Sequence, residues 1–170
     1  MSQQTVATWI RAFWLNTVAA SPLLPPRIRT YVLRWAGVTV SANAAVMQRC
    51  QFISGRRVEL RDHVLVNAGC LFDAWAPIIL SEGVRVGPGV HFVTSTHVVG
   101  GPEMRAAELV HAEVSVGEGC WIGAGAIILP GVHIAPGCVI GAGAVVTHDT
   151  EANGLYLGVP ARRHKDLPVS

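Results

Sequence analysis

A six-residue period runs through most of this chain and constrains its fold more than any other feature. From Val116 the sequence reads VGEGCW, IGAGAI, ILPGVH, IAPGCV, IGAGAV and VTHDTE, and an aliphatic residue opens every unit. A small or branched residue lies two positions before each opening residue. A fixed short period is the signature of a repeat protein, in which every unit folds into the same structural element.

The same frame continues toward the N-terminus with two slips. Gaps of eight residues instead of six separate Phe52 from Leu60 and Phe72 from Leu80. A two-residue extension at a corner turn leaves both flanks in register. The nine opening residues of this part are Val40, Val46, Phe52, Leu60, Val66, Phe72, Leu80, Val86 and Phe92. With the six units after Val116 the chain holds fifteen units, which predicts five coils of three.

Each unit is expected to form a short flat strand and a turn, and three units close a triangle. The aliphatic residue points inward and stacks on its equivalent one coil later. Parallel strands stack at about 4.8 Å, so five coils predict a prism roughly 24 Å tall. No unit can bury its apolar residue alone, and stability therefore comes from stacking.

The four cysteines follow the same frame. Cys50, Cys70, Cys120 and Cys138 all occupy the small inward position. They show no CxxC spacing of the kind that binds zinc, and nothing else in the chain indicates secretion. We expect buried, reduced thiols that pack as small hydrophobic groups.

Composition limits the classes of protein that need consideration. The 170 residues are 51% apolar and only 14% charged, against about 25% charged in a typical domain. The formal net charge of +2 is too small to indicate a nucleic-acid partner. No segment reaches the roughly 20 apolar residues of a membrane span, and we find no signal peptide. We expect a cytoplasmic protein.

Three segments depart from the period. Residues 1–37 are expected to form a helical cap over the open end of the prism, because a bare strand edge would otherwise be exposed. The alternative is docking on a membrane surface through Arg27, Arg29 and Arg34 beside Trp35. Residues 38–150 are expected to form the β-helix with a looped-out segment at 98–112, and residues 151–170 a tail that folds back over it.

The motifs "VGPGVHFVTSTH", "VSVGEGCWIGAGAIILPGVHIAPGCVIGAGAVVTHD" and "GVPARR" together resemble the hexapeptide-repeat acetyltransferases. The similar branch contains the maltose, galactoside and polysaccharide O-acetyltransferases, and the resemblance covers about residues 38–165. It implies an all-β solenoid, a left-handed parallel β-helix, and the handedness rests on the resemblance alone. It also implies transfer of an acetyl group from acetyl-CoA to a hydroxyl of a sugar or polysaccharide precursor. The expected assembly is a homotrimer with sites between subunits and no required metal.

The resemblance places the general base at His97, at the mouth of the looped-out segment. A sugar hydroxyl is a poor nucleophile, and a neutral imidazole within about 3 Å can take its proton, a gain of roughly 10²–10⁴ in rate. By itself, a histidine in a turn is an ordinary surface residue. His111 lies within the excursion and could also reach the site.

The remaining site residues also come from the resemblance. It assigns acceptor binding to Asn67, Trp75, Leu109 and Trp121. It assigns acetyl-CoA binding to Trp121, Ala124, Ala142, Thr147, Gly158, Pro160, Arg162, Arg163 and Lys165, with the backbone N–H near Ala124 at the thioester oxyanion. The alternatives are turn formation for Asn67, a subunit contact for Trp121, repeat packing for the alanines and a solvated basic tail for residues 162–165.

Two departures and three alternatives stay open. Several sugar acetyltransferases carry an acidic residue near Trp75 and an aromatic residue near Leu65, so the acceptor here need not be galactoside or maltose. An N-acetyltransferase acting on an amino sugar or antibiotic would use the same base. A γ-carbonic-anhydrase-like zinc enzyme would use His91, His97 and His111. A non-catalytic assembly subunit would have kept the repeat and lost the chemistry.

Overall fold

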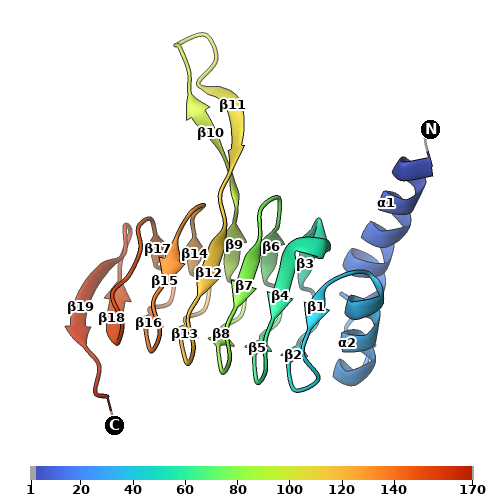
Figure 1. Ribbon diagram of the computed structural model, residues 1–170, viewed down its shortest axis with the longest axis horizontal. Helices are drawn as coiled ribbons and strands as arrows, with labels where there is room; N and C mark the ends of the chain where they lie inside the picture. The colour runs from blue at the N-terminus through green and yellow to red at the C-terminus, as the bar shows by residue number, and fades with distance from the viewer. Residues whose placement is uncertain (1–2, 170) are drawn as a thin grey trace.

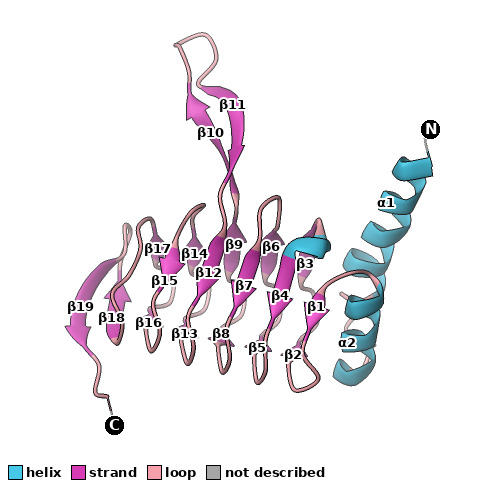
Figure 2. Cartoon of the chain, in the orientation of Figure 1, coloured by secondary structure: helices cyan, strands magenta, loops and turns pink. Residues whose placement is uncertain are grey.

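Three parallel sheets form the three faces of a solenoid in the computed structural model, which describes residues 3–169 (Figures 1 and 2). Sheet A contains β1 (Thr39–Val40), β4 (Val58–Leu60), β7 (Ile78–Leu80), β12 (Val114–Val116) and β15 (His133–Ile134). Sheet B contains β2 (Ala45–Val46), β5 (Leu65–Val66), β8 (Arg85–Val86), β13 (Trp121–Ile122), β16 (Val139–Ile140) and β18 (Gly154–Leu157). Sheet C contains β3 (Gln51–Ile53), β6 (Leu71–Asp73), β9 (His91–Val93), β14 (Ile127–Ile128) and β17 (Val145–Val146). The corners where the chain passes between sheets are called the A–B, B–C and C–A edges.

The expected solenoid is confirmed, and it has about six turns. Five coils are complete, and β18 pairs in parallel with β16 to begin a sixth. The strand β19 (Arg162–Asp166) then reverses and pairs antiparallel with β18. Ile140 pairs with Tyr156, sixteen positions on instead of eighteen, so the six-residue frame fails to find this last strand. The tail therefore continues the solenoid before it folds back.

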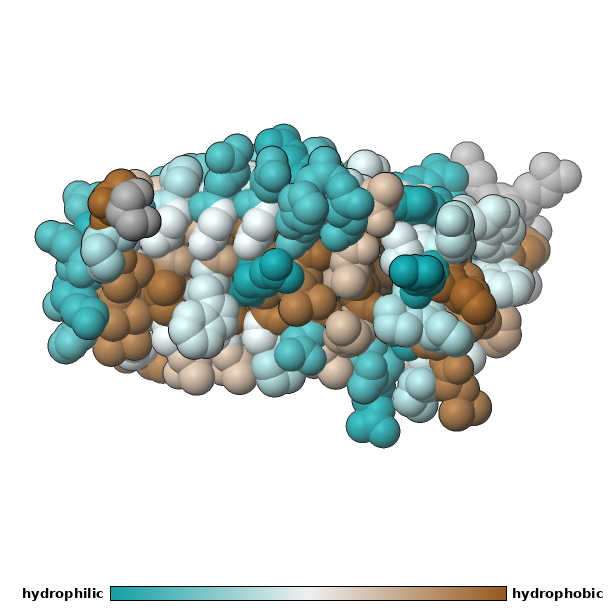
Figure 3. Space-filling model, turned by 90° about the horizontal axis from the view of Figure 1, so that it is seen from below, coloured by the Kyte–Doolittle hydropathy of each residue, from teal (hydrophilic) through white to brown (hydrophobic). Residues whose placement is uncertain are grey.

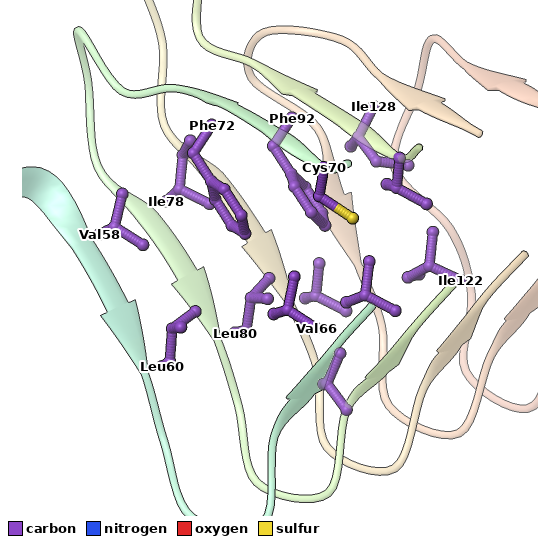
Figure 4. Packing of buried hydrophobic residues seen from close by; sticks show 14 of the residues in the cluster. Val58, Leu60, Val66, Cys70, Phe72, Ile78, Leu80, Phe92, Ile122 and Ile128 are labelled. Carbon is purple, nitrogen blue, oxygen red and sulfur yellow. The ribbon is translucent and has the colours of Figure 1, made fainter. Parts of the chain in front are cut away.

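The interior is the stack that the repeat predicts. All fifteen opening residues are buried, and so are the fifteen small or branched residues that lie two positions before them. Phe52, Phe72 and Phe92 form a column, with ring centroids 4.8 and 5.1 Å apart in successive pairs. Figure 4 shows Phe72 and Phe92 side by side, with side chains from all three faces directed into the same interior. Because each inward residue stacks on the equivalent residue of the next coil, every unit is buried against its neighbours.

The four cysteines are buried and unpaired, as expected. The thiols of Cys50 and Cys70 both donate to the carbonyl oxygen of Asn67, at 3.3 and 3.2 Å. The hydrogen bond with Cys50, followed by burial, raises the pKa of the Cys70 thiol above its ordinary value. The same two causes raise the pKa of Cys120 beside Cys138. Both groups are therefore held as neutral thiols inside the prism.

A helical cap covers the first coil. It consists of α1 (Gln3–Phe13), the π-helix η1 (Trp14–Val18) and α2 (Pro26–Trp35). The side chain of Asn16 donates to the Phe52 carbonyl at 3.1 Å and accepts from the Phe52 N–H at 2.8 Å. These are the two backbone hydrogen bonds that a paired strand would otherwise make with Phe52. Arg34 donates to the Val40 carbonyl at 2.7 Å, and Arg29 donates to the Val46 carbonyl at 3.1 Å. One strand edge in each sheet is thus satisfied by the cap, which prevents edge-to-edge pairing.

The capping expectation is supported by Arg29, which cannot take the part that the alternative of membrane docking gave it. Its side chain is only 2% exposed, and it donates to the carbonyls of Ala19, Ser21 and Leu24 at 2.7, 2.9 and 2.7 Å besides that of Val46. Desolvation by burial lowers the pKa of its guanidinium. Arg29 instead fixes the loop between η1 and α2 to the first coil, because buried carbonyls need hydrogen-bond donors.

The looped-out segment is a β-hairpin that leaves the prism at the C–A edge. Its strands are β10 (Ser95–Val99) and β11 (Ala106–His111), inserted between β9 of sheet C and β12 of sheet A. The hairpin starts at Ser95, three residues before the expected position. Figure 1 shows it projecting from the edge opposite to sheet B.

The two-residue slips fall on the same edge as the hairpin. The first holds the short 3-10 helix η2 (Gly55–Arg57), between β3 and β4. The second lies at residues 74–77, between β6 and β7. Three consecutive coils therefore vary in length, and all three vary at the C–A edge.

Candidate active site

One face of the hairpin gathers the predicted base and its neighbours. Ser95 pairs with His111 and His97 pairs with Leu109 across the two strands. Directly opposed residues of an antiparallel pair point to the same side, so these four side chains share one face of the ribbon. His97, Leu109 and Trp75 were predicted from the sequence as parts of one site, and the hairpin places the first two side by side.

His97 is held by a backbone carbonyl. Its Nδ1 lies 3.0 Å from the carbonyl oxygen of Ala107, and the ring is exposed on the hairpin. A carbonyl oxygen can only accept, so Nδ1 carries the proton in this contact and the Nε2 lone pair is left to accept one. An orienting partner of this kind fixes both tautomer and ring direction. The sequence offers no signal for Ala107, because a backbone carbonyl has no side-chain signature.

An aromatic pair stands at the base of the hairpin. The rings of Trp75 and His111 are stacked, with centroids 5.9 Å apart and planes 18° from parallel. Trp75 is 46% exposed, so one face of the indole is open to a ligand. The sequence named Trp75 as an acceptor residue and noted that His111 could reach the site, but it did not predict their contact.

A buried carboxylate ties the hairpin to the prism. Asp73 is 7% exposed and accepts a hydrogen bond from the hydroxyl of Ser95. The neighbouring Thr94 is fully buried and bonds the backbone carbonyl of Asp73. Asp73 follows an inward Phe, where the coils on either side carry Ile53 and Val93. That change from apolar to acidic was a readable signal, and the sequence interpretation missed it.

A row of predicted ligand residues runs along the B–C edge. Asn67 lies on this edge in the second coil, and Ala124, Ala142 and Gly158 lie on it in the fourth, fifth and sixth. The N–H of Gly143 donates to the carbonyl of Ala124 at 2.8 Å. Asn67, Ala124 and Ala142 are exposed, and the amide oxygen of Asn67 accepts from the N–H of Ala68 at 2.8 Å. Small side chains leave the backbone of this edge open along its length.

Trp121 lies beside that row on the outer side of sheet B. It pairs with Arg85 and Val139 in the neighbouring coils and is 58% exposed. Figure 3 shows the molecule from below, with a broken apolar band along its middle that is flanked by hydrophilic side chains. An exposed indole such as that of Trp121 indicates a contact with another molecule.

The basic tail contains three cationic side chains: Arg163 is hydrogen-bonded within the chain, whereas Arg162 and Lys165 are exposed. Arg163 uses all five of its N–H groups within the chain, on Asp166, Tyr156 and the carbonyls of Glu151 and Ala152. Its predicted contact with CoA would have to displace one of these bonds. The neighbouring Asp166 and Tyr156 raise the pKa of Arg163. Arg162 and Lys165 are exposed on β19, near the end of the B–C row.

The remaining predicted donor-site residues divide between two edges. Gly158 has φ +97° and Pro160 follows two residues later, at the sixth turn. Thr147 instead lies at the C–A edge after β17, where its hydroxyl contacts Nδ1 of His148 at 2.7 Å. His97 also belongs to the C–A edge. The predicted site residues are therefore not brought together within one chain.

The alternative zinc site receives no support within residues 3–169. No group of three His, Cys, Asp or Glu side chains in this part of the chain is arranged to hold a metal ion. His91 lies on sheet C, whereas His97 and His111 lie on the hairpin.

Comparison with known proteins gives consistent matches. A family model described as "Bacterial transferase hexapeptide (six repeats)" matches residues 113–148. Nodulation protein L of Rhizobium leguminosarum bv. viciae is 38% identical over 136 residues, which cover 76% of this chain and 71% of that protein. Nodulation protein L of Rhizobium meliloti is 44% identical over 109 residues, 64% of this chain. The matches span about three fifths of the first two curated relatives, 60% and 59% of their lengths.

Solved structures extend the similarity to nearly the whole chain. A maltose O-acetyltransferase from Clostridium difficile 630 superposes with a TM-score of 0.86 at 26% identity, covering 99% of this chain and 90% of that one. A hexapeptide-repeat acetyltransferase from Vibrio cholerae, solved in complex with acetyl-CoA, gives a TM-score of 0.88 at 25% identity, covering 99% and 91%.

Proposed function

The chain belongs to the hexapeptide-repeat acetyltransferases, in the branch of the maltose and galactoside O-acetyltransferases, and from this premise we propose that it acetylates a carbohydrate hydroxyl. The acyl donor is acetyl-CoA, which a solved relative binds. The acceptor is a sugar or a polysaccharide precursor. The observation that carries the proposal is the contact between His97 Nδ1 and the Ala107 carbonyl, 3.0 Å long. It leaves Nε2 as the proton acceptor on the exposed side of the ring.

His97 acts as the general base in the proposed reaction. Nε2 takes the proton of the acceptor hydroxyl while the oxygen forms a bond to the thioester carbonyl carbon. The carbon–sulfur bond then breaks, and the thiolate of CoA leaves and recovers a proton. Base catalysis of this kind contributes roughly 10²–10⁴ in rate. The Ala107 carbonyl stabilises the imidazolium that forms, because it accepts from Nδ1–H throughout.

The acceptor ring packs at the base of the hairpin. The stacked pair of Trp75 and His111 presents an aromatic face, and a pyranose offers C–H groups that suit such a surface. Leu109 supplies an apolar side opposite His97. Asn67, on the B–C edge of the neighbouring subunit, binds an acceptor hydroxyl through its exposed amide.

Acetyl-CoA lies along the B–C edge of a neighbouring subunit. Ala124 and Ala142 let the pantetheine arm approach backbone N–H and C=O groups, and the N–H near Ala124 stabilises the oxyanion. Trp121 packs beside this arm. Arg162 and Lys165 bind the phosphate groups, and Gly158 and Pro160 complete the donor side on this edge. Thr147 contacts the donor from the C–A edge of the subunit that supplies His97. Arg163 contributes by holding the tail.

The site is formed between two subunits of a homotrimer. The base stands on the C–A edge and the donor row on the B–C edge, and Figure 1 shows the hairpin projecting away from sheet B. One prism cannot present both edges to the same small molecule, whereas the C–A edge of one prism can face the B–C edge of the next. Closed rings of three create this contact three times. Transfer needs no metal, so activity is expected to survive EDTA.

The test of the base is His97→Ala, assayed by thiol release from acetyl-CoA against sugars, nucleotide sugars, glycolipids and amino sugars. We expect turnover to fall by about 10²–10⁴ while acetyl-CoA binding survives. The matched control is His63→Asn, another exposed histidine, which lies on the A–B edge. Turnover retained in His97→Ala would remove His97 as the base. Acetylation of amines alone would favour the N-acetyltransferase alternative.

The shared site is tested by mixing two inactive variants, His97→Ala and Ala124→Trp. Random mixed trimers restore about one site in four, because one variant supplies the base and the other the donor edge. A site contained within one chain would give no recovery. Circular dichroism of each variant checks the fold, and light scattering of the wild type checks the trimer.

A further inference from the structure

The outer side of the helical cap carries a continuous aromatic surface, which we call the cap patch. Ile10, Arg11 and Trp35 line a first hollow, which shares Trp35 with a second, lined by Trp14, Tyr31, Val32 and Trp35. A third hollow shares Tyr31 and lies between α2 and the first coil, lined by Arg27, Tyr31 and Arg34 together with Ala42, Ala44 and Ala45. The rings of Trp14 and Trp35 lie 5.2 Å apart at 71°. The patch therefore joins α1, η1 and α2 into one surface.

The aromatic side chains of this region are open to solvent. Trp35 and Tyr31 are 68% and 69% exposed. On α1 the residues Val6, Trp9, Ile10 and Phe13 are all exposed, and their spacing places them along one stripe of the helix. An apolar stripe on a helix normally faces a core, and this one faces away from the prism. Tryptophan and tyrosine are the residues enriched at membrane–water interfaces.

The charge around the cap patch has a single sign. Arg11, Arg27 and Arg34 form its rim, and the guanidinium of Arg34 lies 5.9 Å from the centre of the Tyr31 ring. Seven of the 13 cationic residues fall in residues 1–58, and none of the 11 acidic residues does. The nearly neutral net charge of the whole chain hides this separation. Each cation close to an anionic leaflet strengthens binding about five-fold.

The inner side of the cap is already occupied by the first coil. Asn16, Arg29 and Arg34 satisfy its strand edges, so the hydrogen bonds of the cap point toward the prism. The outer side of the cap is therefore the side that can contact another molecule. Figure 1 places both helices beyond β1 and β2, at the end of the solenoid. Subunits that pack through the long faces of the prism would leave this end uncovered.

We propose that the cap patch docks on the surface of an anionic lipid bilayer. The helices lie in the plane of the interface, with the aromatic rings at the headgroup level and the arginine rim on lipid phosphates. None of the helices in residues 3–169 is long and apolar enough to cross a membrane. Docking of this kind would bring the enzyme to lipid-linked acceptors.

A second copy of the chain fits the patch less well. An isologous contact would bring the same patch together with itself. The rim of Arg11, Arg27 and Arg34 would then face an identical rim, with no carboxylate from residues 1–58 to pair with it. Like charges directly opposed in an interface are repulsive. An anionic lipid surface supplies the missing negative charge.

Vesicle flotation of the full-length protein tests the proposal. We expect binding to vesicles of phosphatidylcholine that contain roughly one part in three of phosphatidylglycerol, because anionic lipids attract cationic side chains, and none to phosphatidylcholine alone. Binding should weaken at high salt, because the surface potential is screened. Arg27→Gln should lower the partition coefficient about five-fold, the equivalent of about 1 kcal/mol. Its matched control is Arg105→Gln at the hairpin tip, which removes the same charge and should change nothing.

The aromatic contribution is tested with Tyr31→Ser and Trp35→Ser. Both side chains are largely exposed, so the fold should survive, and their combination should reduce partitioning by at least ten-fold. Quenching of tryptophan fluorescence by brominated lipid should weaken in Trp35→Phe. Equal binding to neutral and anionic vesicles, or no binding at low salt, would overturn the proposal. So would a fall in oligomer mass on Trp35→Ser, because it would assign the patch to a contact between copies.

Discussion

The prism and the hairpin are built from the same chain by opposite means. In the prism every opening residue is buried, and Phe72 lies between two other phenylalanine rings. In the hairpin every residue of β10 and β11 is at least partly exposed. The prism is stabilised by repetition of one contact in every coil. The hairpin depends on its own ladder, on the stack of Trp75 and His111, and on the bond between Ser95 and Asp73.

This contrast explains the placement of the chemistry. A residue inside the stack cannot change without disturbing the coils above and below it, because interiors are close-packed. A residue on the hairpin can change without affecting the stack. The proposed base is therefore carried by a region outside the stacked core, and a rigid scaffold positions it.

Phe72→Ala should have the largest effect of these variants, and it acts on the stability of the prism. Removal of the middle ring leaves a cavity in the column and should lower the free energy of unfolding by about 3–5 kcal/mol. Urea denaturation followed by circular dichroism measures it. The control Phe72→Leu keeps most of the volume and should cost about 1 kcal/mol. A loss below 1 kcal/mol for Phe72→Ala would mean that the coils do not stabilise one another.

Arg29→Met tests whether the cap belongs to the prism or behaves as a separate surface. The change leaves the carbonyls of Ala19, Leu24 and Val46 without their donor, so the free energy of unfolding should fall by roughly 2–3 kcal/mol. Thermal denaturation is the measurement. Arg27→Met is the matched control, since Arg27 is exposed and its loss should stay within about 0.5 kcal/mol. Equal effects in the two variants would contradict the cap role of Arg29.

Ser95→Ala separates the two regions, because it should destabilise the hairpin without affecting the prism. Loss of the bond to the Asp73 carboxylate should speed hydrogen exchange of the β10 and β11 amides roughly ten-fold, because bonds to charged groups contribute about 1.5 kcal/mol. Exchange in the prism strands should not change. Mass spectrometry of hydrogen exchange resolves the two regions. Faster exchange throughout the chain would show that hairpin and prism open together.

Met104→Ser gives the smallest expected effect. Met104 lies in the turn between β10 and β11 and is 65% exposed. Its replacement should change the free energy of unfolding by less than about 0.5 kcal/mol. Urea denaturation beside Phe72→Ala gives the direct contrast, and a loss near 2 kcal/mol would assign the hairpin tip to the folding core.

The prism was predictable because its rule is local and repeated. The frame placed Val40 and Val146 in the same role, and both are buried as expected. The sixth turn was missed because Tyr156 arrives two residues early for the frame. The inward direction of Arg29 could not be predicted because the segment before Gly37 has no period, so nothing in the sequence separates an inward arginine from an outward one.

The candidate site was predictable only in part, for a related reason. His97 belongs to a motif, whereas the carbonyl of Ala107 that orients it is set by hairpin register. Asp73 bonds a residue 22 positions away, and that pairing depends on two turns the frame does not describe. The stack of Trp75 on His111 has the same origin. Contacts between an extension and the prism are long-range, and local patterns contain little information about them.

The three irregular coils have a consequence for how such a protein can diversify. The extensions at residues 54–57, 74–77 and 94–113 all lie on the C–A edge, while the other two edges keep their length in the same coils. A longer loop between fixed ends adds only about 0.6 kcal/mol of closure entropy for each doubling. This edge can therefore accept inserted segments without shifting the register of any strand. Grafting a longer loop at residues 74–77, directly beside the hairpin, offers a route to new acceptor preference in which the scaffold is left untouched.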